Sequence, residues 1–344
     1  MIKLSGMLNY SFSRSFALDL GNNNTVVTDD QHILVSQPSY IVFDEAKSAV
    51  KAVGDAAYDI FEKNHSKLRP VKPMHWGVIA DYDSAAKMIR RIVSSVYQTH
   101  WFSKFDRIVC GVPFATTAVE RQALVDSLDQ FGARKTNLLF EPLAAAIGMR
   151  LNIREPEGKM VIDIGGGITE IVIISLSGIA VFQSIKTAGD SFTEEIKDYF
   201  RQVHQLSIGW KTAEKIKLQV GAALVDIDNP PPPVTVSGKD IREGLPVQRM
   251  VDHREIARVL EKSLATIERS IINVLEVCPP ELAADIYESG IHLTGGSALL
   301  RGLPERLQRS IQLPVHRDAE PLLAVGKGIS EVLRDPKHYR SILI

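Results

Sequence analysis

VIDIGGG (residues 161–167) and LDLGN (residues 18–22) present one signature twice in the same chain, an apolar strand that ends in an aspartate and a glycine turn. A second apolar strand follows each turn, at residues 171–176 and 25–28. Glycine permits a tight turn and lets backbone N–H groups approach anionic oxygens, because no Cβ blocks positive φ or close contact. One such turn is weak evidence, since hairpins need glycine for structural reasons. Two copies that face each other predict a phosphate clamp.

The composition predicts a soluble globular protein of two domains. A chain of 344 residues is long enough for two cores, and 45% hydrophobic and 24% charged residues are ordinary values. Lys and Arg total 40 against 41 for Asp and Glu, so no general field attracts nucleic acid, and we expect no nucleic-acid partner. Cys110 and Cys278 have neither disulfide nor metal spacing, which fits a cytoplasmic protein. No apolar run reaches the ~18 residues that a membrane span requires.

Strands and helices alternate along the chain, which predicts an α/β fold with mixed sheets. In the first half we expect strands at 16–28, 33–43 and 107–112, and helices at 52–63, 83–97 and 117–131. Thr117 and Glu120 form a capping box at the start of the last helix. In the second half we expect strands at 160–186 and 291–294, and helices at 191–204, 211–221, 253–276 and near the C-terminus.

Five segments of the chain carry a joint signal: LDLGNNNT (18–25), RPVKPMHWGVIADYD (69–83), FEPLAAAIG (140–148), VIDIGGGITEIVIISLSGI (161–179) and HLTGGSALLRGL (292–303). Together they resemble the actin-like ATPase superfamily, and their sequences are close to those of the bacterial rod-shape-determining actins, the MreB family. TAEKIK (212–217) and CPPELAADI (278–286) favour MreB over the sugar kinases and heat-shock chaperones of the superfamily.

The resemblance implies two lobes, each with a mixed sheet flanked by helices, and a nucleotide in the cleft between them. The first lobe would span 1–150, as subdomain IA with an insertion, IB, at about 34–68. The second would span 151–325, as subdomain IIA with an insertion, IIB, at about 186–250, around the proline tract at 229–233. Residues 326–344 would form a C-terminal helix that returns to the first lobe.

The resemblance assigns ATP and Mg²⁺ to the cleft. The phosphate-binding candidates are Asn22, Asn23, Asn24, Gly165, Gly166 and Gly167, and the metal-binding candidates are Asp19 and Asp163. Taken alone, the asparagine turn is equally well explained as a structural turn, because Asn tolerates the left-handed conformation. Its pairing with the second turn favours binding.

Two further segments are assigned to the nucleoside by resemblance. The first is Glu214, Lys215, Ile216 and Lys217, on a predicted helix, and the second is Gly295, Gly296, Ser297 and Ala298, after a predicted strand. Glu214 and Lys217 are three residues apart and share a helix face, so a solvated ion pair is the alternative. The glycine segment has a plain strand-to-helix turn as its alternative.

By resemblance, catalysis is assigned to Glu141, which would orient the water that attacks the γ-phosphate, together with Asp163. Glu141 precedes Pro142 at the start of an alanine-rich helix, where a carboxylate could instead complement the helix dipole. Asn22 and Ile168 stand where the family usually has threonine, and Ile168 cannot form a hydrogen bond. We therefore expect retained nucleotide binding and a weak, slow ATPase.

By resemblance to the membrane-insertion loop of the family, membrane contact is assigned to Trp101 and Phe102, in a loop that follows a predicted helix and also contains Lys104. Aromatic side chains at such a loop enter the lipid interface while cations meet anionic lipid. The alternative is that both rings fold onto the core. Residues 1–14 form a weaker amphipathic candidate.

The expected function is that of an ATP-binding filament protein, a homopolymer that lies in the cytoplasm against the inner face of the cell membrane. By resemblance it would organise cell-wall synthesis with cell-shape and wall-synthesis membrane proteins and determine rod shape. A soluble sugar or metabolite kinase of the same superfamily is the alternative from another class. A polymer that binds nucleotide but scarcely hydrolyses it is a third possibility.

Overall fold

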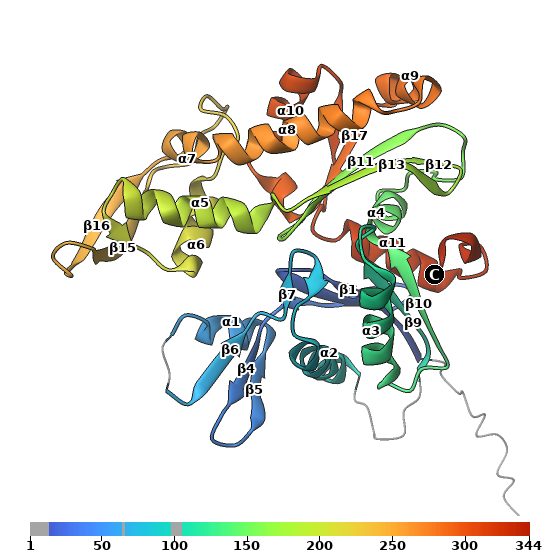
Figure 1. Ribbon diagram of the computed structural model, residues 1–344, viewed down its shortest axis with the longest axis horizontal. Helices are drawn as coiled ribbons and strands as arrows, with labels where there is room; N and C mark the ends of the chain where they lie inside the picture. Colours follow the sequence, from blue (N-terminus) through green and yellow to red (C-terminus); the bar gives the residue numbers. More distant parts are fainter. Residues whose placement is uncertain (1–13, 64–65, 98–104) are drawn as a thin grey trace, which may run out of the picture.

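The computed structural model describes residues 14–63, 66–97 and 105–344, and in it the chain forms two lobes, each built on a five-stranded sheet (Figure 1). The predicted α/β fold with mixed sheets is confirmed. Trp101, Phe102 and residues 1–13 lie outside the described residues. None of the helices within the described ranges combines the length and the apolarity that a membrane span needs.

The sheet of the first lobe has the strand order β10-β9-β1-β2-β3. Its strands are β1 (Arg14–Leu20), β2 (Asn24–Thr28), β3 (Ile33–Pro38), β9 (Phe105–Val112) and β10 (Lys135–Phe140). β1 pairs antiparallel with β2 and parallel with β9. α2 (Tyr82–Val96) buries Met88, Ile89 and Ile92 in the core of this lobe, and α3 (Ala118–Asp129) begins at the predicted capping box of Thr117 and Glu120.

The sheet of the second lobe repeats this pattern in the order β13-β12-β11-β17-β18. Its strands are β11 (Lys159–Ile164), β12 (Thr169–Ser175), β13 (Gly178–Ile185), β17 (Ile291–Thr294) and β18 (Val315–Arg317). β11 pairs antiparallel with β12 and parallel with β17, as β1 does with its neighbours. α8 (Glu261–Glu276), α9 (Pro280–Ser289) and α10 (Leu303–Ile311) accompany this sheet. Each signature turn therefore joins the two strands of a hairpin, β1–β2 in the first lobe and β11–β12 in the second.

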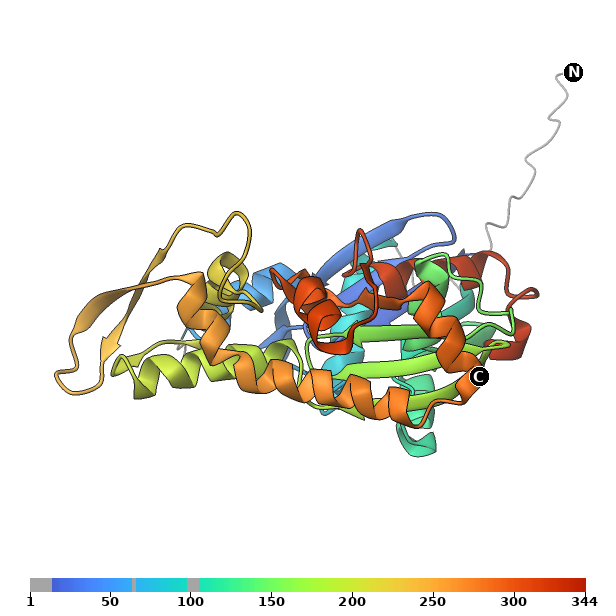
Figure 2. The same cartoon turned by 90° about the horizontal axis from the view of Figure 1, so that it is seen from above.

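Two smaller units extend from the lobes toward the same side of the molecule (Figure 1). The first contains β4 (Ile41–Asp44), β5 (Ala49–Val53), β6 (Leu68–Val71) and α1 (Gly54–Ile60). The second contains β14 (Leu206–Ser207), β15 (Val234–Asp240), β16 (Pro246–Val251), α5 (Gly189–Gln202), α6 (Trp210–Val220) and α7 (His253–Val259). Seen from above, the β15–β16 hairpin lies at one end of the molecule (Figure 2). β7 (Met74–His75) and β8 (Val78–Ile79) form a short hairpin after the first unit.

Two helices pack together at the junction of the lobes, α4 (Glu141–Gly148) and α11 (Ala324–Arg334). A Cβ on Gly328 would lie 1.7 Å from the carbonyl oxygen of Ala144, so the backbones of the two helices touch. α11 also contacts β1 and β9 of the first lobe. The buried cluster around these helices includes Val109 of one sheet and Val161 of the other, and it joins the lobes. The short helix η2 (Arg340–Ile342) closes the chain.

Several predicted elements differ from those in the structure. The predicted helix at 253–276 is interrupted at Leu260, where α7 ends and α8 begins. The predicted helix at 52–63 begins only at Gly54, because Ala52 and Val53 pair with β4 as the end of β5. No helix was predicted at α9, in the segment between the predicted helix at 253–276 and the predicted strand at 291–294.

Candidate functional site

A cleft of about 670 Å³ lies between the lobes and is lined by both signature turns. Most of the predicted site residues line it: Asp19, Asn22, Asn23, Asn24, Glu141, Asp163, Gly165, Gly166, Gly167, Glu214, Lys217, Gly295, Gly296 and Ser297. Three others do not. Lys215 is exposed on α6, while Ile216 and Ala298 pack in the hydrophobic core of the second lobe. These three were assigned to the site because they lie within the matching motifs, but a helix or turn presents only some of its residues to one side.

The first turn joins β1 to β2 and presents side-chain amides. A Cβ on Gly21 would lie 2.7 Å from the carbonyl oxygen of Asn24, so the turn requires glycine there. Asn22 is buried, with 6% of its surface exposed, and Asn23 lies next to it. Both side chains donate to the carboxylate of Asp190, from Asn22 Nδ2 at 2.5 Å and from Asn23 Nδ2 at 2.8 Å. The asparagines therefore act as donors through their side chains.

The second turn, residues 165–167, presents bare backbone to the first. A Cβ on Gly166 would lie 2.4 Å from Asn23 Nδ2, and one on Gly167 would lie 2.7 Å from Asn22 Cγ. Only glycine allows the two turns to approach this closely. The two turns face each other across the cleft, as the sequence analysis predicts.

Four carboxylates gather near the turns: Asp19, Glu141, Asp163 and Glu170. Desolvation raises the pKa of Asp163 to about 6. Desolvation and the neighbouring carboxylates also raise the pKa values of Asp19 and Glu141, and no cationic side chain among the described residues offsets the effect. The negative charges of these carboxylates repel one another, and a bound cation would reduce this repulsion.

Glu170 was missed by the sequence analysis. It is 4% exposed, and its Oε1 accepts a hydrogen bond of 2.8 Å from the backbone N–H of Phe114 in the other lobe. Burial raises its pKa to about 8. The available signal was an acidic residue within the otherwise apolar strand that follows the glycine turn.

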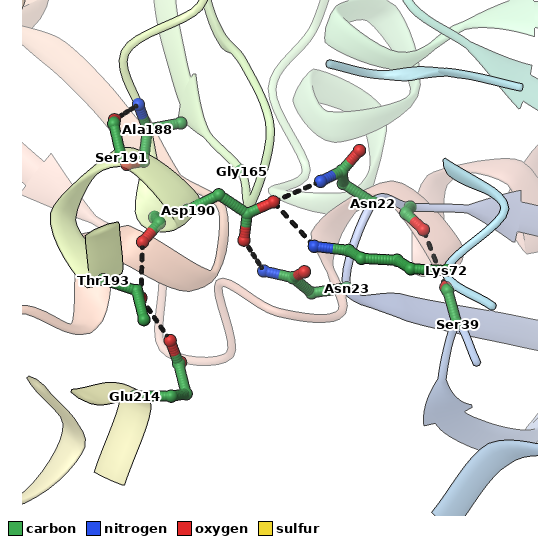
Figure 3. A network of polar contacts seen from close by, with 12 residues as sticks. Asn22, Asn23, Ser39, Lys72, Gly165, Ala188, Asp190, Ser191, Thr193 and Glu214 are labelled. Atoms are coloured by element: carbon green, nitrogen blue, oxygen red, sulfur yellow. Dashed lines mark hydrogen bonds and ion pairs between the residues drawn. The ribbon is translucent and has the colours of Figure 1, made fainter. Parts of the chain in front are cut away.

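Asp190 and Lys72 were also missed, although they lie at the centre of the polar network in Figure 3. Lys72 Nζ donates to Asp190 Oδ2 at 2.7 Å, beside the two asparagines. Lys72 stands within the quoted segment 69–83, where it received no role. Asp190 follows Gly189 at the first turn of α5, a position at which acidic residues are favoured anyway, so its sequence signal was ambiguous.

Glu214 and Lys217 form the ion pair that the sequence analysis weighed as an alternative, at 2.8 Å, but it is largely buried and lines the cleft. Lys217 Nζ also donates to the carbonyl oxygen of Gly189 and to Thr193 Oγ1, at 2.8 and 2.9 Å. Thr193 in turn donates to Glu214 at 2.5 Å. The pair therefore fastens α6 to α5 at one wall of the cleft.

The segment after β17 braces the second turn. Gly295 has a φ of +86°, and a Cβ there would lie 2.3 Å from Asp163 Oδ1 and 2.4 Å from the carbonyl oxygen of Ile164. Ser297, in the short helix η1 (Gly296–Leu299), donates through Oγ to the carbonyl oxygen of Gly165 at 2.8 Å. The segment thus holds the glycine turn in place as well as lining the cleft.

Ile168 lines the cleft beside the second turn. Its Cδ1 lies 2.7 Å from the position of a Cβ on Gly77, whose φ is +77°. The neighbouring Thr169 is fully buried and donates to the carbonyl oxygen of Thr187 at 2.7 Å. Its hydroxyl is therefore occupied elsewhere and does not replace the hydroxyl that a threonine at 168 would provide.

Comparison with known proteins identifies the family. The family description MreB/Mbl protein matches residues 13–341. The cell shape-determining protein MreB of Escherichia coli (strain K12) is 37% identical over 327 residues, which cover 94% of each chain. The cell shape-determining protein Mbl of Bacillus subtilis (strain 168) is 35% identical over 321 residues, which cover 92% of this chain and 96% of the relative.

Solved structures agree with this similarity. The crystal structure of MreB 5 of Spiroplasma citri bound to AMPPNP has a TM-score of 0.90 and 33% identity, over 95% of this chain and 98% of that one. The MamK double helical filament has a TM-score of 0.76 at 19% identity, over 94% of this chain and 99% of that one, which is a likeness of fold. The chain belongs to the MreB/Mbl family of actin-like cell-shape proteins.

Proposed function

We propose that this chain binds Mg²⁺ and ATP in the interlobe cleft and assembles into filaments on the cytoplasmic face of the cell membrane, where it organises cell-wall synthesis. The observation that carries the nucleotide site is the contact of two glycine turns from different lobes above a group of buried carboxylates. The kinase alternative finds no support among the relatives, which are cell shape-determining proteins.

The cleft suits a nucleotide in size and chemistry. A volume of about 670 Å³ is within the range of small-molecule sites. The N–H groups of residues 165–167 and the amides of the asparagine turn are donors for phosphate oxygens. Glu214, Lys217 and the apolar Leu299 and Leu322 line the part of the cleft assigned to the nucleoside. Solved structures of Spiroplasma citri MreB5 bound to AMPPNP and to ADP support the proposal that this chain binds a nucleotide.

The carboxylates fit a cation that arrives with the nucleotide. Among the described residues no group of three or more His, Cys, Asp and Glu is arranged to hold a metal by itself. Mg²⁺ in nucleotide sites uses only one or two protein carboxylates, together with phosphate oxygens and water. Asp19 and Asp163, whose charges are uncompensated, would hold it. When bound, Mg²⁺ neutralises charge on the phosphates.

Hydrolysis is the slower part of the proposed activity. Glu141 lines the cleft from the first turn of α4, close enough to Asp19 and Asp163 for their charges to raise its pKa. It would orient the attacking water, which is the main task of the protein in phosphoryl transfer. Ile168 presents a branched alkyl group at the position where the family usually has a hydroxyl, so we propose that turnover is weak.

The nucleotide site is tested by the change Asp163→Ala. Loss of a metal-binding carboxylate should weaken Mg²⁺·ATP binding by at least tenfold, about 1.4 kcal/mol, in calorimetry. Asp226→Ala removes a carboxylate that is 89% exposed in a different part of the second lobe, and it should leave the affinity as in the wild type. Unchanged affinity in Asp163→Ala would contradict the assignment of the metal site.

Membrane attachment is proposed from the sequence and the family, because Trp101 and Phe102 lie outside the described residues. Changing both residues to Ser should abolish co-sedimentation with anionic liposomes and leave polymerisation in solution intact. Each ring would contribute roughly 1.5 to 3 kcal/mol by burial in lipid. Normal liposome binding by the double variant would show that the membrane anchor lies elsewhere, and residues 1–14 are the next candidate.

A further inference from the structure

Asp190 occupies a site made of three side-chain donors that all belong to the first lobe. Asn22 Nδ2 and Lys72 Nζ donate to Oδ2, at 2.5 and 2.7 Å, and Asn23 Nδ2 donates to Oδ1 at 2.8 Å (Figure 3). The site is sheltered, since the side chain of Lys72 is 11% exposed and that of Asp190 is 21% exposed. Charge-assisted hydrogen bonds of this kind are among the stronger ones in proteins.

Asp190 is anchored to the second lobe. Its backbone N–H donates to the carbonyl oxygen of Gly166 at 2.7 Å, and Gly189 donates to the carbonyl oxygen of Gly165 at 3.1 Å. These bonds fix the first turn of α5 to the second glycine turn. Asp190 therefore reaches across the cleft, and its carboxylate joins the second lobe to the asparagines and Lys72 of the first.

The same asparagines fill the space between the two turns. The side chains of Asn22 and Asn23 lie against Gly167 and Gly166, at the distances given above for an added Cβ. A phosphate group that passes between the turns must displace these amides or take over their hydrogen bonds. In either case it competes with the carboxylate of Asp190.

A terminal phosphate is well suited to that competition. It carries more negative charge than a carboxylate and has three acceptor oxygens, which match the number of donors. Lys72 would remain near the cleft after the exchange, because its ammonium lies 6.0 Å from the centre of the Tyr40 ring and 5.6 Å from that of the Trp210 ring. Both rings line the cleft.

We propose that Asn22, Asn23 and Lys72 form an anion site that Asp190 occupies as an internal ligand, and that the terminal phosphate of a nucleoside triphosphate displaces Asp190 from it. The inference rests on the proposed function, which brings phosphates between the two turns. A diphosphate lacks the γ-phosphate and leaves Asp190 in place. The exchange thus discriminates triphosphate from diphosphate and links that difference to the contact between the lobes.

The test compares the dissociation constants of AMPPNP and ADP, each with Mg²⁺, in calorimetry. Asp190→Ala removes the competitor and should strengthen AMPPNP binding about tenfold relative to ADP. Lys72→Met removes a donor and should weaken AMPPNP binding about tenfold relative to ADP. In the double variant the gain from Asp190→Ala should shrink to threefold or less, because the main charged donor that it frees is gone.

Glu62→Gln provides the matched control. Glu62 also bridges the lobes, since its carboxylate accepts from the backbone N–H groups of Trp210 and Lys211 at 2.5 and 2.9 Å, but it is not among the described residues that line the cleft. Loosening the lobes through Glu62 should change both affinities by the same factor. If Asp190→Ala behaves like Glu62→Gln, or weakens AMPPNP more than ADP, the inference is wrong.

A separate outcome distinguishes the proposed function from this inference. A wild-type protein that binds neither nucleotide contradicts the proposed function itself. A wild type that binds both, with an unchanged AMPPNP to ADP ratio in folded Asp190→Ala, contradicts the internal ligand alone. Asp190→Asn, which keeps the shape of the side chain, should shift the ratio in the same direction if Asp190→Ala unfolds.

Discussion

The two signature turns occupy equivalent places in equivalent hairpins, yet they work differently. The first turn holds Asp190 through the side chains of Asn22 and Asn23. The second turn offers three glycines, and its contacts are made by backbone atoms. Replacing an asparagine of the first turn therefore removes a donor, whereas a side chain added at Gly166 or Gly167 of the second turn meets the first turn. The side chains of the first turn determine which groups are bound, and the bare backbone of the second turn determines how closely the lobes approach.

The largest expected effect concerns the end of the second turn, at Ile168. Ile168→Thr introduces a hydroxyl beside the proposed terminal phosphate and should raise the single-turnover rate of ATP hydrolysis by up to about 10² to 10³, the usual value of one well-placed transition-state hydrogen bond. Ile168→Val is the matched control, because valine has the shape of threonine without the hydroxyl. It should hydrolyse ATP as slowly as the wild type.

The same experiment tests the role of Glu141. Glu141→Ala should remove most of the remaining hydrolysis in both the wild-type and the Ile168→Thr backgrounds, with nucleotide affinity retained. A wild type that already hydrolyses as fast as Ile168→Thr would place Ile168 outside the shell that positions water. Equal acceleration by Thr and Val would instead indicate that the bulk of Ile168 against Gly77, and not the missing hydroxyl, limits the rate.

A stability experiment tests the contact between the turns. Gly167→Ala places a Cβ 2.7 to 2.9 Å from three side-chain atoms of the buried Asn22 and should lower the free energy of unfolding by about 2 kcal/mol. In the background Asn22→Ala the same change should cost at least about 1 kcal/mol less, because the obstructing amide is gone. Urea unfolding of the four proteins measures this coupling. Additive effects would mean that the turns do not touch in solution.

Much of this arrangement could be predicted from sequence, because it depends on local signals. The two Asp-Gly hairpins, the capping box of Thr117 and the helix that starts at Glu141 were all visible as residue patterns. What the sequence did not reveal depends on contacts across the cleft. Asp190 meets Asn22 from 168 residues away, and a lone aspartate at a helix start already has a local explanation.

Too many residues were also assigned to the site because they lie within matching motifs. Ile216 and Ala298 lie within the quoted segments, but helix geometry turns them into the core. Glu170 shows the opposite error, since it belongs to a quoted segment and received no role. Its partner, the N–H of Phe114, lies in a loop of the other lobe with no sequence signal of its own. Residue spacing predicts which face a side chain occupies, and only the packed lobes determine what it meets there.

The last expected effect, similar in size to that of Gly167→Ala, concerns the different response of the two turns to pH. Desolvation raises the pKa of Asp163 from its ordinary value near 3.8 to about 6, so the folded protein favours its protonated form. The stability that this protonated carboxyl contributes is fully present below pH 3.8 and is lost as the pH rises through about 6. Asp163→Asn should therefore gain about 2 kcal/mol of unfolding free energy relative to the wild type as the pH rises from 4 to 7. Asn24→Ala, at the end of the first turn, removes no ionisable group, and its difference from the wild type should stay constant over that range. Urea unfolding at several pH values, without nucleotide, measures both differences, and a constant difference for Asp163→Asn would show that its carboxylate is not destabilised by the cleft.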